Sequence, residues 1–302
     1  MQQDYQPVTM KRIIHFLIIF LISFPAFATS RALVIGIGKY DRVKTGWNTI
    51  HGDNDVSLLK PWLIKRGFSD LVTLTNEEAT KTRIVNELKS LAQRSSKGDK
   101  IFFLFSGHGQ PIRDDNHDEG NGKGYDESII PYDACRDKLK MDGKYEGQYH
   151  LIDDELCPLF DSIKKKLGSN GELFVAVDAC YSKGIQKDEY TDLDPDLLRF
   201  IRGTDSAFTP PKHSSYLARV PKPNRFTPGA KMYIVTACAS DERNFEYKSD
   251  SGKMYGSLAY YIYTLLKTDA NFSRWERCFN EKDYLKRNIF QVTQHPSIEV
   301  YK

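Results

Sequence analysis

The sequence predicts an α/β fold built on one mostly parallel sheet of about six strands, with helices on both faces. Short apolar runs, rich in β-branched and aromatic residues, are typical of strands buried on both faces. Amphipathic segments with helical spacing alternate with these runs in β-α-β-α-β order, which favours a parallel sheet. The chain has 302 residues, 40% of them hydrophobic and 27% charged, which is sufficient for such a domain.

Each predicted element follows from its local pattern. The apolar runs predict strands at 31–37, 71–74, 99–105, 173–177, 231–237 and 298–301. Helical spacing of apolar residues predicts helices at 53–65, 80–93, 152–167, 257–266 and 281–292. Asp53 is the expected N-cap of the first helix. Residues 113–125 are acidic and glycine-rich and predict a surface loop, followed by a short edge hairpin at 126–133.

The first 28 residues have the pattern of a secretory signal peptide. Lys11 and Arg12 precede an apolar run at 13–24, and Ala26 and Ala28 are small residues at the two positions that signal peptidase recognises. We therefore expect cleavage after Ala28 and an exported protein, periplasmic or secreted, with no stable membrane anchor. The alternative is an uncleaved anchor, although the run is shorter than the roughly 20 residues that span a bilayer.

Charge argues against one class of partner. The formal net charge is only +3, and the chain has no block of Lys and Arg of the kind that follows a phosphate backbone. Nucleic acid is therefore not expected as a partner.

The cysteine count is informative because export implies an oxidising compartment. There are five cysteines, so at least one remains a thiol, and we expect this to be Cys180. Pairing among the other four stays open: Cys135, Cys157, Cys238 and Cys278.

Two predicted strands end in residues that carry chemistry. The strand at 99–105 leads into Ser-Gly-His-Gly at 106–109, and the strand at 173–177 leads into Asp-Ala-Cys at 178–180. The carboxyl ends of parallel strands meet at one sheet edge, where ligands usually bind. Cysteine attacks as the thiolate, and an imidazole accepts and returns the proton. A single His or Cys at a strand end is more often structural, but His108 and Cys180 together predict a reactive pair.

These two motifs closely resemble the histidine and cysteine motifs of the metacaspases and caspases, cysteine peptidases of clan CD and family C14. The signal-like N-terminus suits an exported bacterial member. Segments 31–40, 51–55, 126–133, 152–155 and 233–246 match in the same order, so the resemblance covers about 31–266. It implies a caspase-hemoglobinase fold in one domain over 29–302. A large-subunit-like part (29–204), a proline-rich linker (205–229) and a small-subunit-like part (230–302) would make up this domain.

The resemblance also implies catalytic roles. His108 would be the general base, Cys180 the nucleophile, and the N–H groups of Gly109 and Cys180 the oxyanion hole. The reaction would pass through a thioester acyl-enzyme and would need no cofactor for its chemistry.

Specificity is expected from the carboxylates Asp55 and Asp178, beside Ser106, which match the primary pocket of metacaspases. A buried acidic pair attracts a guanidinium or ammonium group, so the resemblance implies protein or peptide substrates cut after Arg or Lys. The structural alternatives are a first-turn helix carboxylate for Asp55 and a turn cap for Asp178.

Calcium is a further expectation from the family, as an activator bound by four aspartates. Three of them match Asp126, Asp153 and Asp154, while the fourth position holds Lys187 with Asp188 next to it. Calcium prefers six to eight oxygen ligands, so the loss of one carboxylate weakens the site. The alternative for the pair at 153 and 154 is favourable placement in a first helical turn.

The sequence departs from the family pattern around the nucleophile. Ala179 and Tyr181 stand where a second cysteine or a histidine is usual, and Lys183 replaces a glycine. The lysine either lowers the pKa of the thiol or crowds the pocket.

The linker suggests a zymogen that processes itself. It is rich in proline and contains basic residues at which a peptidase of this specificity would cut: Lys212, Arg219, Lys222 and Arg225. The alternative is that these charges only solvate a loop.

Two other functions remain open. A caspase-fold scaffold without turnover would be expected to lack a member of the dyad, yet both are present. A peptidase with an acidic preference would need arginines where Asp55 and Asp178 stand.

Overall fold

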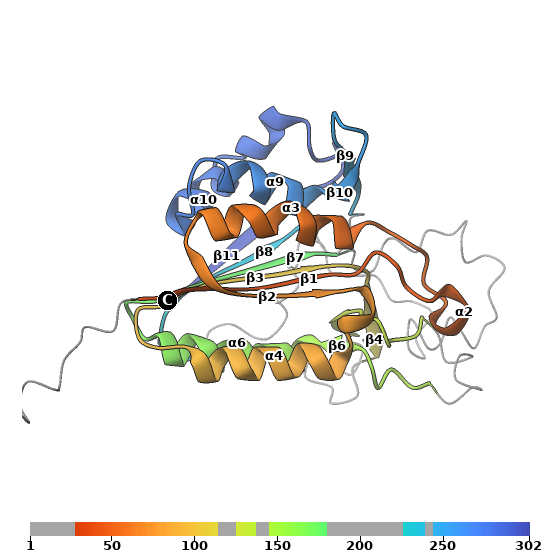
Figure 1. The fold of residues 1–302 in the computed structure, drawn as a ribbon, viewed down its shortest axis with the longest axis horizontal. Helices are drawn as coiled ribbons and strands as arrows, with labels where there is room; N and C mark the ends of the chain where they lie inside the picture. Colours follow the sequence, from red (N-terminus) through yellow and green to blue (C-terminus); the bar gives the residue numbers. More distant parts are fainter. Residues whose placement is uncertain (1–27, 114–124, 137–144, 180–225, 239–243) are drawn as a thin grey trace, which may run out of the picture.

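A six-stranded sheet forms the centre of the computed structural model, which describes residues 28–113, 125–136, 145–179, 226–238 and 244–302 (Figure 1). The strand order is β11-β8-β7-β3-β1-β2. Five strands are parallel, and β11 runs antiparallel to β8. The predicted α/β class and the mostly parallel sheet are therefore confirmed. The strands are β1 (Ser30–Gly36), β2 (Phe68–Thr75), β3 (Lys100–Ser106), β7 (Glu172–Asp178), β8 (Lys231–Thr236) and β11 (Ser297–Tyr301).

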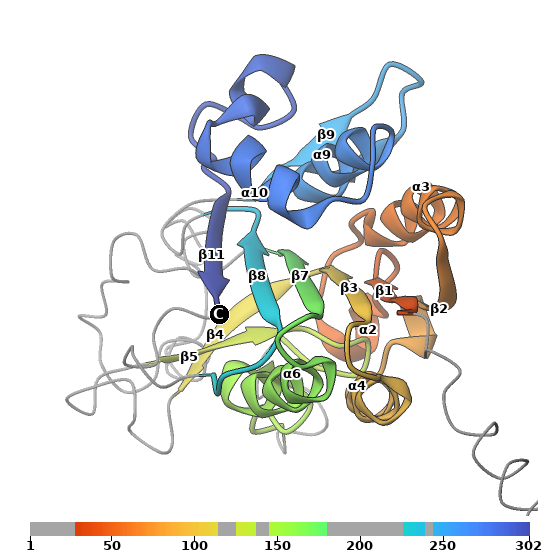
Figure 2. The same cartoon turned by 90° about the vertical axis from the view of Figure 1, so that its left-hand side faces the viewer.

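Helices cover both faces of the sheet (Figures 1 and 2). One layer contains α3 (Gly52–Lys65), α9 (Ser257–Leu266) and α10 (Phe272–Asn280), and the other contains α4 (Lys81–Arg94) and α6 (Asp153–Leu167). Successive side chains of a strand point to opposite faces. In β3, Phe103 and Phe105 accordingly join the buried cluster on the α4/α6 side, while Phe102 and Leu104 join the other cluster. Because both faces are covered, each of positions 101–105 of this strand is apolar.

Smaller elements lie outside this sheet. A second, three-stranded sheet consists of β4 (Gly109–Arg113), β5 (Tyr125–Ile129) and β6 (Leu151–Ile152), and a short ribbon consists of β9 (Glu246–Lys248) and β10 (Met254–Gly256). Single turns of helix occur at α2 (Arg42–Thr45), η1 (Asn76–Glu78) and η2 (Asp283–Arg287). Strand β5 lies in the region predicted as an edge hairpin, but its partners are β4 and β6.

Two local predictions are wrong. The helix expected at 281–292 is only the 3₁₀ turn η2, because Lys282 and Asn288 at its ends adopt left-handed backbone angles that a helix cannot continue through. The last α-helix is instead α10, which was not predicted although its buried residues Phe272, Trp275 and Phe279 have helical spacing. Helix α3 begins at Gly52, one residue before the expected cap Asp53, and its N-cap is His51.

Several predictions concern residues outside the described part. The signal peptide to residue 27 and the linker from 205 to 225 lie there, as do Cys180 and Lys183. Among the described residues, none of the four cysteines Cys135, Cys157, Cys238 and Cys278 is in a disulfide. No described helix combines the length and apolar character that crossing a membrane requires.

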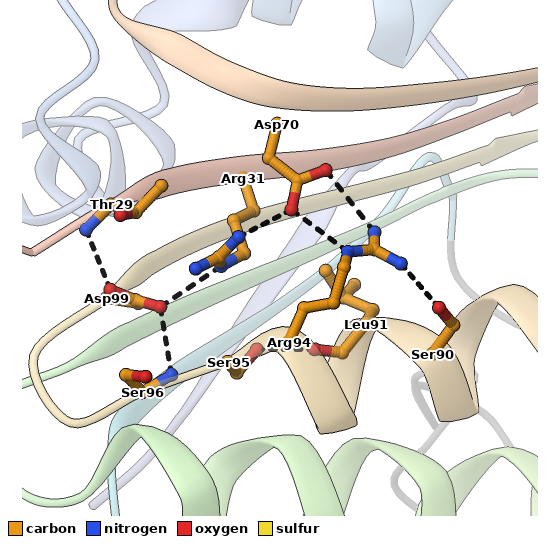
Figure 3. Close-up of polar contacts among 9 residues, drawn as sticks. All are labelled: Thr29, Arg31, Asp70, Ser90, Leu91, Arg94, Ser95, Ser96 and Asp99. Carbon is orange, nitrogen blue, oxygen red and sulfur yellow. Dashed lines mark hydrogen bonds and ion pairs between the residues drawn. The ribbon is translucent and has the colours of Figure 1, made fainter.

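A polar network ties together the edge of the sheet opposite the motifs (Figure 3). Asp99, only 1% exposed, accepts hydrogen bonds from the backbone N–H groups of Thr29 (2.7 Å) and Ser96 (2.9 Å) and from Arg31 Nε (3.1 Å). Arg31 also reaches Asp70, which pairs with Arg94. One buried carboxylate therefore fixes the start of β1 and the turn before β3.

We expect Asp99→Asn to lower the free energy of unfolding by about 2–4 kcal/mol, because an amide cannot accept all three hydrogen bonds and Arg31 loses a buried partner. Asp70→Asn is the matched control, with an expected loss of about 1 kcal/mol, since this carboxylate is more exposed. Urea unfolding of both variants measures the difference. Equal losses would contradict the role given to Asp99.

Candidate active site

Strand register brings the ends of the two motif-bearing strands together. Ser106, the last residue of β3, lies opposite Asp178, the last residue of β7. Beyond this pair, Gly107 N–H donates to the carbonyl oxygen of Asp178 at 3.1 Å. The carboxyl ends of both strands therefore form one edge of the sheet, and His108 lies there. Cys180, two residues after Asp178, is outside the described residues.

The imidazole of His108 is held by two consecutive residues of the loop after α2. The indole of Trp47 stacks on it, with ring centroids 4.7 Å apart and an interplanar angle of 24°. The carbonyl oxygen of Asn48 lies 2.9 Å from Nε2. A carbonyl can only accept, so Nε2 carries the proton and Nδ1 of the neutral ring is the basic nitrogen.

The backbone of His108 is fixed separately by Tyr40. The His108 N–H donates to the Tyr40 hydroxyl at 3.1 Å, and this hydroxyl donates to the carbonyl of Ile130 at 2.9 Å. Burial raises the pKa of Tyr40, so the phenol stays protonated and can act as this donor. Ile130 N–H returns a hydrogen bond to His108 O at 3.0 Å. Gly109, the next residue, begins β4, so strand pairing orders the backbone beside the imidazole.

The protein keeps His108 neutral. Burial, reinforced by the charge of Arg136, lowers the pKa of His108 to about 4, although the hydrogen bond to Asn48 O acts in the opposite direction. At neutral pH the ring is therefore a proton acceptor at Nδ1.

Asp55 and Asp178, two of the predicted pocket residues, converge on Gly256 at the start of α9. Asp55, which is fully buried, accepts from Ser106 Oγ at 2.6 Å and from Gly256 N–H at 3.0 and 3.1 Å. A Cβ on Gly256 would lie 2.2 Å from Asp178 Oδ2 and 2.9 Å from Asp55 Oδ2. Only glycine therefore allows the two carboxylates to approach this closely.

Asp178 is 2% exposed and has partners of its own. It accepts from Asn244 Nδ2 at 2.6 Å and from the backbone N–H of Ala259, in the first turn of α9, at 2.8 Å. The contact of Asp178 with the N-terminus of α9 agrees with its structural alternative, a cap. Asp55 lies in the first turn of α3, which agrees with its own structural alternative, a first-turn helix carboxylate. Both carboxylates therefore have structural contacts as well as a shared location.

The aspartates share this region with a third carboxylate. Glu246 pairs with Gly256 in the β9/β10 ribbon. Its carboxylate contacts His51 twice: Oε1 accepts a hydrogen bond from the His51 backbone N–H at 2.7 Å, and Oε2 lies 2.8 Å from His51 Nδ1. Burial raises the pKa of Asp178 to about 6, with a contribution from Glu246. Burial and the charge of Asp178 raise the pKa of Asp55 well above its usual value. Such a concentration of acidic groups favours a cationic ligand.

The three candidate calcium ligands also come together. Asp126 of β5 and Asp153 and Asp154, the first two residues of α6, each offer an oxygen, and these oxygens lie within 4.8 Å of one another. Hard carboxylate oxygens are the donors that Ca²⁺ prefers, so the donor set fits this ion. The remaining candidates, Lys187 and Asp188, lie outside the described residues.

Several residues of the site were not foreseen. Tyr40, Trp47 and Asn48 lie between the predicted strand at 31–37 and the predicted helix at 53–65, where no site residue was expected, and the two buried aromatic residues there were the available signal. Gly256 and Asn244 have no signal in a single sequence, because their importance arises from what folds against them.

We expect the unchanged protein to lose stability relative to Asp178→Asn as the pH rises from about 4 to 7. The comparison between the two proteins is needed because His108, whose folded pKa is lowered, contributes stability in the opposite direction over this range. An acid whose folded pKa of about 6 exceeds its unfolded value of about 3.9 stabilises the fold below pH 3.9 and loses that contribution as the pH passes 6, roughly 3 kcal/mol in all. Urea unfolding across this pH range measures the slope. Asp250→Asn, at an exposed turn, is the control, and equal slopes in all three proteins would contradict the prediction.

Comparisons with known proteins identify the family of this chain. The family profile described as metacaspase, peptidase C14 domain matches residues 30–187. Metacaspase-1 of Plasmodium falciparum is 32% identical over 163 residues, covering 50% of this chain and 24% of that protein. Metacaspase-2 of Arabidopsis thaliana is 28% identical over 249 residues, with coverages of 78% and 51%, and Metacaspase-1 of Mycosarcoma maydis is 25% identical over 264 residues, with coverages of 76% and 60%.

This chain thus spans about a quarter to three fifths of the length of these relatives. Among solved structures, protein GSU0716 from Geobacter sulfurreducens superposes with a TM-score of 0.59 at 18% identity, covering 90% of this chain and 93% of its own, and so shares the fold. The matched segment contains both motifs and the carboxylates Asp55 and Asp178. The chain belongs to the metacaspase family of C14 cysteine peptidases.

Proposed function

We propose that this protein is a cysteine endopeptidase that hydrolyses proteins or peptides after Arg or Lys. The observation that supports this most directly is the state of His108, a neutral imidazole whose Nε2–H is bound to Asn48 O and whose Nδ1 can accept a proton. Ser106 and Asp178 are paired in register at the ends of two neighbouring strands, and His108 and Cys180 each come two residues later in the sequence. This equal spacing supports the assignment of the two residues to one catalytic dyad.

The dyad would act as follows. His108 Nδ1 takes the proton of the Cys180 thiol, and the thiolate attacks the carbonyl carbon of the scissile bond. The N–H groups of Gly109 and Cys180 stabilise the resulting oxyanion. The C–N bond then breaks, the imidazolium gives its proton to the leaving amine, and a thioester remains. Water attacks the thioester as His108 accepts its proton, and the thiol is regenerated. No cofactor takes part in these steps.

The acidic cluster supports the preference for a basic residue. Asp55 and Asp178 are buried together with one charged neighbour of the same sign, Glu246, so ionising both is unfavourable while the pocket is empty. An incoming guanidinium or ammonium group would favour the ionised forms. An acidic substrate side chain would meet repulsion instead.

We further propose calcium as an activator rather than a participant in the chemistry. Asp126, Asp153 and Asp154 would hold the ion and neutralise charge where β5 meets α6. Strand β5 pairs with β4, which begins directly after His108, so an ion there would stabilise the backbone near the base.

Two further parts of the proposal come from the sequence. An exported, periplasmic or secreted protein agrees with the signal-like first 28 residues, and self-processing agrees with the basic residues of the linker.

Peptides that carry Arg, Lys or Asp before a reporter group test the activity. We expect the full chain to release the reporter after Arg and Lys only, and Cys180→Ala to lose at least about 10³-fold in kcat/KM, because the nucleophile is gone. Cys278→Ala, a half-exposed thiol of α10, is the matched control and should keep its activity.

Cleavage after Asp would overturn the specificity, and absence of hydrolysis by folded protein would favour the scaffold function. Denaturing gels of the same preparations test self-processing. A linker cut that appears equally in the Cys180→Ala protein would rule it out.

Calorimetric titration with CaCl₂ tests the metal proposal. We expect binding with a Kd of about 10⁻⁴ to 10⁻³ M, as in extracellular calcium modules, and weakening of at least about tenfold in Asp153→Asn. Glu155→Gln is the matched control, because Glu155 is also in the first turn of α6 but pairs with Lys81. This variant should bind calcium as tightly as the unchanged protein does. Equal weakening in both variants would point to general charge rather than to a site.

A further inference from the structure

Trp47 and Asn48 restrain the His108 imidazole in different ways. The Asn48 carbonyl binds the ring at one point, Nε2, and a single hydrogen bond leaves the ring plane able to tilt. The Trp47 indole, nearly parallel to the ring at 4.7 Å, restricts this plane. Since the two residues are adjacent, one loop segment determines both the hydrogen bond and the plane of the imidazole.

The indole is itself firmly placed. Trp47 is 8% exposed, and its Nε1–H donates to the carbonyl oxygen of Ala134 at 3.1 Å. On the same side, Arg136 N–H donates to Thr45 O at 2.7 Å. The preceding Gly46 has a φ of 83°, which ends α2 and turns the chain toward His108. The segment after β5 and the loop after α2 therefore hold the indole between them.

Other contacts of His108 do not duplicate this one. Tyr40 lies at a ring distance of 5.0 Å with a tilt of 48°, and its hydroxyl binds the backbone of His108 rather than its side chain. Arg136 is a charged group that acts on the imidazole from the segment after β5, and it disfavours the protonated ring. Among the described residues, Trp47 is thus the one that stacks on the His108 ring.

We propose that Trp47 is a positioning residue of the catalytic site, which fixes the plane of the His108 ring while Asn48 holds Nε2, so that Nδ1 serves as the proton acceptor, and which excludes water from one face of the ring. This inference rests on the proposed function. An apolar cover disfavours the imidazolium ion, in the direction of the low pKa of His108. A cation–π contact between the indole and the imidazolium would instead raise the pKa of His108. Whether this pKa rises or falls when the indole is removed therefore distinguishes an apolar cover from a cation–π contact.

The first test does not require turnover. In full-length Cys180→Ala protein, NMR titration of the imidazole protons gives the pKa of His108, with His108→Ala to assign the signal among the seven histidines. We expect Trp47→Ala to raise this pKa from about 4 toward 6.5, and Trp47→Phe to raise it less. Trp62→Ala, a partly buried indole on α3, is the matched control and should leave the pKa unchanged. An unchanged or lower pKa in Trp47→Ala would overturn the proposal.

The second test uses peptide hydrolysis by the same Trp47 variants with Cys180 intact. We expect kcat to fall about 10–100-fold in Trp47→Ala with KM changed less than about threefold, because a misplaced base impairs the chemical step and not substrate binding. The acidic limb of the pH profile should move to higher pH. If the unchanged protein does not hydrolyse any peptide, the proposed function fails while the titration still decides the role of Trp47. If Trp47→Ala does not fold, Trp47→Phe must still shift the titration, and an unchanged value would count against the proposal.

Discussion

The end of β7 is the constraint on which the rest of the site depends. Asp178 closes the register with Ser106, accepts from the first turn of α9 and shares the space around Gly256 with Asp55. A carboxylate with these contacts is difficult to replace, because its charge, its helix-capping contact and its position are used together. The same side chain therefore links the sheet, a covering helix and the acidic cluster.

The acidic cluster also joins the two halves of the chain. Asp55 and His51 come from the start of α3, and they bind Gly256 and Glu246 near the start of α9. Burying like charges close together is unfavourable. Hydrogen bonds from backbone N–H groups and from His51 offset part of this cost. An acidic cluster assembled from both halves forms only when both have folded.

Much of the fold could be predicted from the sequence because strands buried on both faces leave no choice of residue. Residues 101–105 are all apolar, and alternate side chains of this run pack in two separate clusters. The pairing of the two motif-bearing strands followed from the same logic. Helix α10 was missed although its buried residues have helical spacing, and the helix expected at 281–292 failed because left-handed residues interrupt it. Trp47 and Gly256 could not be assigned, since their partners are more than 60 residues away in sequence.

The pairing of β7 with β8 has a consequence for any cut in the intervening chain. These strands are parallel neighbours in register from Glu172 to Val177, and β11 adds a further strand beyond β8. A broken peptide bond between residues 180 and 225 would therefore leave two polypeptides that share both hydrophobic clusters. Among the described residues only noncovalent contacts would join the two polypeptides, and the integrity of such a complex would depend on protein concentration.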